Sequence, residues 1–399
     1  VEAEHGLNII PNSPIVRESY GIDDTHPTAA ALATPIVDTA IPYEAVWDCV
    51  TCGACVEACP VLIEHVDKIV GLRRNLVLEE SRFPAELTGA FRAMEGQGNP
   101  WGQPASARTD WTNGLPFEVP TVAALAAEGR LDEIEVLYWV GCAAAFDERN
   151  KKVARAFATC LHAAGVSFAI LGQEESCTGD PARRMGNDYV FQMLAMGNIE
   201  TLGRYGMAER TIVTACPHCF NTIANEYGQL GGAFSVVHHS VYLAGLLEAG
   251  RLATLPEEAG SATGDHRPGS VTVHDACYLS RYNGVIAAPR DVLAGAGLGV
   301  TEMAKSGKDT FCCGAGGGRM WMEEHRGTRI NAERTRQVLE TGASTVATAC
   351  PFCMVMLRDG LSDAGEKAGD VVAMDVSELL AARIAAAPPE RVLPVVRAG

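Results

Sequence analysis

The alternation of apolar and polar residues changes character at about residue 131. From there on, short apolar runs alternate with longer stretches whose apolar residues recur at helical spacing. The expected strands are 136–140, 167–171, 210–215, 234–238, 271–274 and 344–349, and the expected helices are 148–164, 183–205, 241–252 and 320–339. Strands that alternate with helices predict βαβ units, and therefore an α/β fold with mainly parallel sheets.

The chain before residue 131 lacks this alternation. Residues 1–40 are expected to form an extended lead-in segment, and the amphipathic stretch 64–78 is expected to be a helix. Residues 93–120 are rich in Gly, Pro, Asn and Trp, which predicts a long ordered loop. We therefore assign residues 41–130 to a separate module that contains a helix and this loop.

The second part of the chain is an internal duplication. Segment 214–219 (Thr-Ala-Cys-Pro-His-Cys) matches segment 348–353 (Thr-Ala-Cys-Pro-Phe-Cys) at an offset of 134 residues. The other matched cysteines are Cys142 with Cys277, at an offset of 135, and Cys177 with Cys313, at an offset of 136. Near-constant offsets predict two repeats of one structural unit. We place repeat 1 at 131–255, a linker rich in Pro, Gly and Glu at 256–270, and repeat 2 at 271–399.

Size and composition exclude several classes of protein. A chain of 399 residues has room for two or three domains, and 47% hydrophobic with 20% charged residues is typical of a soluble globular protein. The chain has no run of about 18 apolar residues, so no membrane span is expected. A net charge of −17 argues against a nucleic-acid partner and favours a protein partner. A first residue other than methionine predicts either processing or a piece of a longer chain.

The 14 cysteines point to metal or redox chemistry. Their spacing is too short and too clustered for a disulfide framework, which a chain of this size does not need. The expected compartment is therefore the reducing cytoplasm. The run Cys49, Cys52, Cys55, Cys59 and Pro60 has the spacing of a bacterial ferredoxin [4Fe–4S] site. Zinc sites more often use two separated cysteine pairs.

The fourth cysteine of that run has two interpretations. In two-cluster ferredoxins the fourth cysteine of one run binds the other cluster. Either all four cysteines hold one cluster, or Cys59 belongs to a cluster whose remaining ligands lie upstream of Val1.

The Cys-Pro-His-Cys segment at Cys216 and Cys219 taken alone also resembles a dithiol redox motif at a helix start. The duplication favours cluster ligation, because a dithiol site needs no third and fourth cysteine at fixed distances. Cys312 and Cys313 are adjacent and open into a glycine run, so two thiolates can reach different irons.

The glycine run and two histidines are further candidates for contact with a cofactor. Gly314 and Gly316 are expected to let backbone N–H groups approach cluster sulfurs, since the run does not fit a dinucleotide motif. His274 and His238 end predicted strands, where ligand sites of α/β proteins collect. They are candidates for cofactor contact or proton handling, with a purely structural role as the alternative.

The cysteine pattern resembles the duplicated CCG domain of heterodisulfide reductase catalytic subunits. That domain also occurs in iron–sulfur subunits of glycolate, lactate and glycerol-phosphate dehydrogenases. The resemblance implies a noncubane [4Fe–4S] cluster on five cysteines in repeat 2: Cys277, Cys312, Cys313, Cys350 and Cys353. Repeat 1 departs from the pattern, because it offers Cys142, Cys177, Cys216 and Cys219 with Ser176 in place of the first paired cysteine. This degenerate set leaves open an ordinary cluster, a modified one or none.

Longer stretches resemble the actinobacterial EtfD-type membrane iron–sulfur oxidoreductases. These stretches are 41–60, 98–111, 176–191, 216–222, 238–239 and 312–325. The resemblance implies electron transfer from electron-transfer flavoprotein, reduced in fatty-acid β-oxidation, to menaquinone in a membrane part with haem. It also implies a location at the cytoplasmic face of the cell membrane, with this chain as the soluble portion.

We therefore expect an iron–sulfur electron-transfer oxidoreductase: a ferredoxin-like helical [4Fe–4S] module followed by two CCG α/β domains. One alternative is disulfide cleavage of the heterodisulfide reductase kind, for which an open pocket at the Cys312–Cys313 site would be a sign. Another is the iron–sulfur subunit of a glycolate, lactate or glycerol-phosphate dehydrogenase. A third is a structural zinc protein without a redox role.

Overall fold

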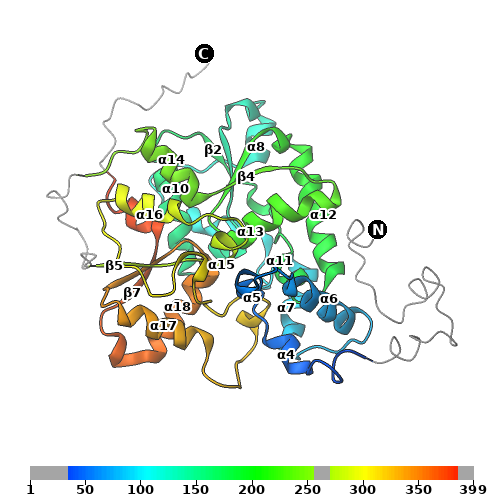
Figure 1. Ribbon diagram of the computed structural model, residues 1–399. Helices are drawn as coiled ribbons and strands as arrows, with labels where there is room; N and C mark the ends of the chain where they lie inside the picture. The colour runs from blue at the N-terminus through cyan, green and yellow to red at the C-terminus, as the bar shows by residue number, and fades with distance from the viewer. Residues whose placement is uncertain (1–34, 256–269, 385–399) are drawn as a thin grey trace, which may run out of the picture.

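The computed structural model describes residues 35–255 and 270–384. The predicted lead-in segment and linker lie almost wholly outside these ranges. Within them, an N-terminal helical module packs against two α/β units, and the two units stand side by side (Figure 1). This order confirms the predicted α/β class with parallel sheets.

The N-terminal module is built of short helices. They are α4 (Tyr43–Asp48), α5 (Ala54–Ala58), α6 (His65–Leu78), α7 (Leu87–Gln97), the 3₁₀ helix η1 (Ala105–Thr112) and α8 (Val122–Ala127). Helix α6 confirms the helix predicted at 64–78. The segment 93–120 is less irregular than predicted, because it contains the end of α7 and all of η1. Trp111 and Arg108 of η1 are buried, and their burial fixes this segment against repeat 1.

Repeat 1 has a four-stranded parallel sheet in the order β2-β1-β3-β4. The strands are β1 (Val136–Trp139), β2 (Phe168–Ala169), β3 (Thr211–Thr214) and β4 (Ser235–His238). The main helices are α9 (Cys142–Phe146), α10 (Asn150–Ala163), α11 (Asp180–Arg184), α12 (Asp188–Arg204), α13 (Pro217–Asn221) and α14 (His239–Glu248). A π-helical turn, η5 (Thr222–Glu226), extends α13. All four predicted strands are therefore present.

Repeat 2 has a three-stranded parallel sheet in the order β5-β6-β7. The strands are β5 (Val271–His274), β6 (Thr345–Thr348) and β7 (Val372–Asp375). The helices are α15 (Cys277–Ser280), α16 (Ala287–Gly295), α17 (Ile330–Glu340), α18 (Pro351–Ala364) and α19 (Val376–Ala381). Strand β7 and helices α16, α18 and α19 were not predicted.

Two predicted helices begin in the wrong place. The helix predicted from residue 183 starts only at Asp188, because Gly186 adopts φ +84° and a Cβ there would lie 2.4 Å from the carbonyl carbon of Arg73. Asn187 then caps α12 by accepting a hydrogen bond from the N–H of Val190. The helix predicted from residue 320 starts at Ile330, whose N–H is bound by the Glu324 side chain.

The two repeats meet through a buried chain of side chains. His238 and Asp375 end β4 and β7, and each caps the helix that follows. His239 joins them, with its Nδ1 3.3 Å from His238 Nε2 and its Nε2 2.9 Å from an Asp375 oxygen. All three are at most 1% exposed. The structure therefore places the candidate His238 at the interface between the repeats, where its described side-chain partners are His239 and Ser240.

Candidate metal centres

In each repeat, two cysteines directly follow the carboxyl ends of parallel strands. Cys142 and Cys277 follow β1 and β5 and begin helices α9 and α15. Cys216 and Cys350 follow β3 and β6 and are the N-caps of α13 and α18. The carboxyl ends of parallel strands form the usual ligand edge of α/β proteins. Because β1 neighbours β3 and β5 neighbours β6, the order of the strands places one pair of cysteines side by side in each repeat.

The cysteines of repeat 1 line one pocket. This pocket has about 360 Å³ between its atoms, part of it open to solvent. Its lining includes Cys142, Cys177, Cys216 and Cys219 together with Trp101, Phe352 and His218. Ser176 is not part of the lining, and a Cβ on Gly98 would lie 3.1 Å from the Ser176 hydroxyl. Four converging thiols fit an iron–sulfur cluster, and Ser176 contributes no fifth ligand.

A buried arginine supplies positive charge to the repeat 1 pocket. Arg108 Nη2 lies 3.2 Å from the sulfur of Cys142, and its Nη1 donates to a Glu175 oxygen at 2.9 Å. Glu175 also accepts the N–H groups of Val140 and Gly141, although burial raises the pKa of its carboxyl group. No local pattern marks Arg108 in the sequence, because its partners are 34 and 67 residues away.

Arg108→Met is expected to lower the free energy of unfolding by about 3 kcal/mol, because it leaves the Glu175 carboxylate buried and without its counter-charge. Urea denaturation followed by circular dichroism measures this loss. The double variant Arg108→Met with Glu175→Gln is the control. It should regain most of the stability, and a double variant as unstable as Arg108→Met would contradict the explanation.

The cysteines of repeat 2 converge in the same way. Cys312 lies within hydrogen-bonding reach of Cys277 and Cys313, and Cys350 within reach of Cys353. All five are buried, and every described cysteine is a free thiol. The N–H of Gly314 donates to the sulfur of Cys312 at 3.3 Å. The five thiols therefore fit the cluster that the resemblance implies.

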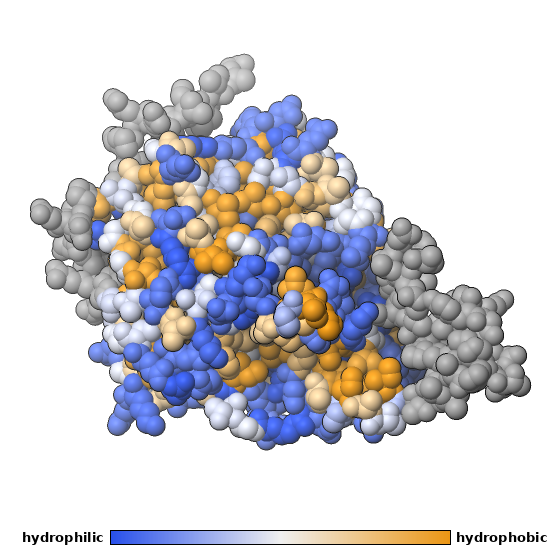
Figure 2. Space-filling view, viewed as in Figure 1, coloured by the Kyte–Doolittle hydropathy of each residue, from blue (hydrophilic) through white to orange (hydrophobic). Residues whose placement is uncertain are grey.

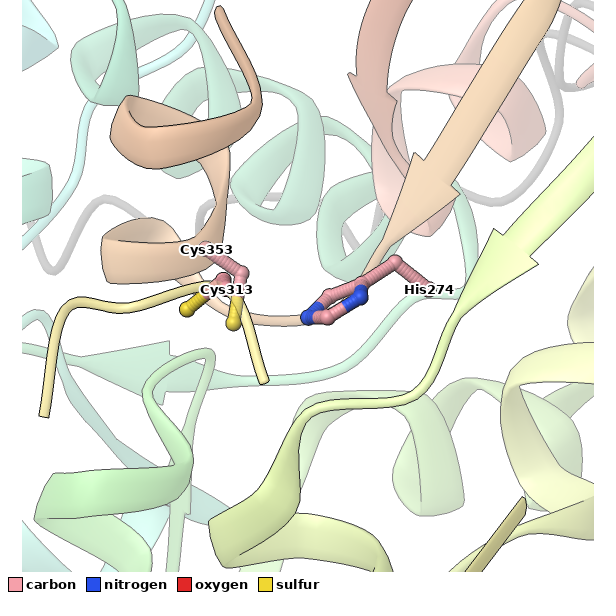
Figure 3. A group of neighbouring side chains, drawn as sticks. All are labelled: His274, Cys313 and Cys353. Atoms are coloured by element: carbon pink, nitrogen blue, oxygen red, sulfur yellow. The ribbon is translucent and has the colours of Figure 1, made fainter. Parts of the chain in front are cut away.

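One histidine belongs to the same group. The side chains of His274, Cys313 and Cys353 bring their ligand atoms within 4.8 Å of one another, and all three are buried (Figure 3). Burial lowers the pKa of His274. The structure thus unites His274 with the repeat 2 cysteines, whereas His238 lies at the repeat interface.

The ferredoxin-type loop covers the repeat 2 centre. Cys52 reaches the thiol of Cys312, and this contact, with burial opposing it, lowers the pKa of Cys52 to about 6. The hydroxyl groups of Tyr278 and Tyr282 donate to the side chain and the carbonyl of Thr51 at 3.0 and 2.7 Å. The ferredoxin-type site and the repeat 2 site are therefore direct neighbours.

Gly316 lies against the backbone of the ferredoxin-type loop. A Cβ at this position would lie 2.3 Å from the carbonyl oxygen of Val50 in the ferredoxin-type loop. At Gly317, which has φ +64°, a Cβ would lie 2.4 Å from the carbonyl oxygen of Cys49. The glycine run thus admits the backbone of the loop, in addition to the sulfur contact made by Gly314.

Gly316→Ala is therefore expected to push the ferredoxin-type loop away from repeat 2. We expect a loss of about 2 kcal/mol in the free energy of unfolding, which urea denaturation would measure. Gly299→Ala is the matched control, because a Cβ at Gly299 meets no atom within 4 Å. Equal stability of the two variants would show that the loop does not pack as described.

The ferredoxin-type cysteines differ in their described contacts. Cys49 has Cys52 and Cys55 as electrostatic neighbours. The described contacts of the Cys59 thiol are instead backbone N–H groups, with Ile63 foremost, and they lower its pKa. Val61, Leu62 and Ile63 are 72%, 66% and 54% exposed, and Figure 2 shows apolar surface over α5 and α6. Among the described contacts, none joins Cys59 to the other three.

Arg73 ties the three parts of the chain together. Its side chain is fully buried, and burial lowers its pKa to about 10, so it stays charged at neutral pH. It donates hydrogen bonds to four carbonyl oxygens, at 2.6 to 3.0 Å. These belong to Val46 and Cys49 of the module, Arg184 of repeat 1 and Gly317 of repeat 2. Sequence reasoning missed Arg73, because nothing in its neighbourhood marks these distant partners.

Aromatic side chains separate the two repeat centres. His218, between Cys216 and Cys219, stacks on Tyr278 with ring centroids 4.1 Å apart. It also packs against Phe352, its counterpart in repeat 2, at 4.9 Å. Asp180 accepts a hydrogen bond at 2.9 Å from His218 Nδ1. The two centres therefore share one wall, to which both repeats contribute.

Comparison with known proteins supports the assignment of the two repeats and of iron–sulfur chemistry. The family model for the CCG cysteine-rich domain matches residues 136–224 and 271–358. A probable iron–sulfur-binding oxidoreductase, FadF, of Bacillus subtilis is 43% identical over 87% of this chain and 47% of its own length. The EtfAB:quinone oxidoreductase of Syntrophomonas wolfei is 40% identical over 91% of this chain and 49% of its own length.

This chain matches a third relative over most of that relative's length. It is one of the subunits of the dihydromethanophenazine:CoB–CoM heterodisulfide reductase of Methanosarcina barkeri, 33% identical over 84% of this chain and 77% of its own length. The chain thus spans about half the length of the first two relatives and most of the third. Among the helices of the described residues, none is long and apolar enough to cross a membrane.

Proposed function

Because the chain belongs to the family of iron–sulfur oxidoreductases with two CCG domains, we propose that it carries electrons from reduced electron-transfer flavoprotein towards a membrane quinone. The donor and acceptor are taken from the relative named EtfAB:quinone oxidoreductase. This chain would lie at the cytoplasmic face of the membrane, next to a quinone- and haem-binding part.

The proposal includes three cysteine centres. Repeat 2 would hold a noncubane [4Fe–4S] cluster on its five cysteines, and the ferredoxin-type loop would contribute Cys49, Cys52 and Cys55 to a cubane cluster. Cys59 would serve a neighbouring ferredoxin-type cluster, as the fourth cysteine of such a run does in two-cluster ferredoxins. Repeat 1 would hold a further cluster on its four cysteines. Bound clusters supply one-electron redox chemistry, while the protein supplies thiol ligands, burial and hydrogen bonds to sulfur.

The contact between Cys52 and Cys312 carries this proposal most directly. Two redox centres whose ligands touch can exchange electrons without a diffusing carrier. The shared wall of His218, Tyr278 and Phe352 extends the same row to repeat 1. An arrangement of adjoining centres is what an electron relay needs.

Disulfide cleavage at the repeat 2 centre is less well supported. The ferredoxin-type loop, Tyr278 and Tyr282 cover that centre. The pocket lined by the repeat 1 cysteines also has Trp101, His218 and Phe352 in its lining. A disulfide substrate would have to displace the loop before it reached Cys312 and Cys313.

Reduction by electron-transfer flavoprotein tests the proposal. The complete protein would be mixed with an acyl-CoA, its dehydrogenase and the flavoprotein, and the clusters followed by EPR. We expect signals of reduced clusters within the time of flavoprotein turnover. Clusters that stay oxidised there, but are reduced by a lactate or glycerol-phosphate dehydrogenase flavin, would assign the chain to a different donor.

A further inference from the structure

His274 is in contact with two groups of opposite character. On one side, Arg334 Nε donates a hydrogen bond to His274 Nδ1 at 2.9 Å. On the other side, the ring points its far nitrogen towards the sulfurs of Cys313 and Cys353 (Figure 3). His274 is 2% exposed, and its Nε2 has no hydrogen-bond partner among the described residues. This buried nitrogen is therefore aimed at the repeat 2 centre.

Arg334 is held so that it can act only as a donor. Its side chain is fully buried and also donates to the Thr310 hydroxyl, the Lys305 carbonyl and the Gln337 side chain, at 3.2, 3.0 and 2.8 Å. A guanidinium group has no acceptor. His274 Nδ1 must therefore offer its lone pair, and it cannot carry a proton.

This geometry fixes the tautomer of His274. An imidazolium ion would carry a proton on both nitrogens, so the ring is neutral and its single proton is on Nε2. A nitrogen that carries a proton cannot bind iron. Ligation of iron by Nε2 would leave both nitrogens without a proton, which requires an imidazolate. The hydrogen bond from Arg334 thus argues against His274 as a cluster ligand.

We propose that His274 donates an Nε2–H···S hydrogen bond to a sulfur atom of the repeat 2 centre, and that Arg334 holds His274 in the tautomer that this bond requires. The inference rests on the proposed cluster at Cys313 and Cys353. A hydrogen bond to sulfur stabilises the more negative, reduced state and so raises the reduction potential. His274 then tunes this centre directly, and Arg334 is the positioning residue that acts through it.

Repeat 1 has no histidine–arginine pair at the matching positions. At the offset that relates Cys142 to Cys277, Trp139 stands where repeat 2 has His274. At the offset that relates Cys177 to Cys313, Asn198 stands where repeat 2 has Arg334, and it binds the Cys177 carbonyl instead. The histidine donor is therefore specific to repeat 2, whereas in repeat 1 the sulfur of Cys142 receives a hydrogen bond from Arg108.

The test compares His274→Leu, which removes the donor, with His274→Gln, whose amide keeps an N–H at a similar reach. His162→Leu is the control, because it makes the same change at an exposed position of repeat 1. Each variant is analysed for iron and sulfide and then titrated by EPR with dithionite and redox mediators. We expect full iron content in all of them. In His274→Leu, the ratio of reduced to oxidised repeat 2 cluster at a given potential should fall about tenfold. For a one-electron couple, this corresponds to a reduction potential that is about 59 mV lower.

The Gln variant should keep most of the wild-type potential, and Arg334→Leu should lower it by less than His274→Leu does. Besides the Gly314 N–H at Cys312, deuterium exchange should reveal a further exchangeable proton coupled to the cluster by pulsed EPR in the wild type, and the loss of this proton in His274→Leu. Loss of iron from His274→Gln would make His274 a ligand and overturn the inference. An unchanged potential in His274→Leu, or absence of the coupled proton in the wild type if that variant fails to fold, would also overturn it. The titration uses no flavoprotein, so failure of the proposed electron donor would leave its result unchanged.

Discussion

Cys313→Ser is expected to remove the cluster of repeat 2, with a loss of about four irons per chain. Cys313 is 4% exposed and lies at the centre of the repeat 2 site, because its thiol is within reach of Cys312, Cys353 and His274. A serine hydroxyl is a poor substitute for a soft thiolate ligand. The EPR signal of this centre should disappear, while the ferredoxin-type cluster remains and its spectrum loses the splitting that the repeat 2 cluster causes.

Cys160→Ser is the matched control for this experiment. Cys160 is fully buried in the core of repeat 1, where its closest described hydrogen-bond partner is the Ser377 carbonyl. It should keep full iron content even if its stability falls. If Cys313→Ser also kept its iron and its spectra, the assignment of the five repeat 2 cysteines would be wrong.

Arg73→Met is expected to cause the largest loss of stability, on the order of 5 kcal/mol. The side chain would leave four carbonyl oxygens without their donor, and an unpaired buried polar group costs about 1–3 kcal/mol. Because these oxygens belong to three parts of the chain, the ferredoxin-type module should also separate from the repeats.

Limited proteolysis and urea denaturation of the variant measure these two effects. Arg92→Met on the exposed face of α7 is the control, since it removes the same charge at the surface. A loss below about 1 kcal/mol for Arg73→Met, which is typical of a surface change, would contradict the central role of this arginine.

The sequence predicted what local spacing and repetition encode. The cysteine run at Cys49, the duplication and the strand ends before Cys142 and Cys277 were predicted, and the structure places the cysteines of each repeat together. Helix α18 of repeat 2 was not predicted, although its buried residues Met354, Leu357 and Leu361 recur at helical spacing. The late start of α17 depends on a side-chain contact from Glu324 that no periodicity reveals.

The contacts between the parts could not be predicted in this way. Arg73, Arg108 and Arg334 each have partners far away in the sequence, and each looks like an ordinary charged residue of a helix or loop. The sequence predicted a close approach of another group to the backbone at Gly316. The structure places the backbone of Val50 next to this glycine. Such pairings depend on how the three parts dock, which a single sequence does not specify.

EPR of the fully reduced protein tests the central claim most directly, which is that the ferredoxin-type and repeat 2 centres are adjacent members of one electron relay. The contact between Cys52 and Cys312 predicts magnetic interaction between the two reduced clusters. The spectrum should show splittings that are independent of microwave frequency, and Cys313→Ser should abolish them. Two independent signals, unchanged in the presence or absence of the other cluster, would contradict the relay.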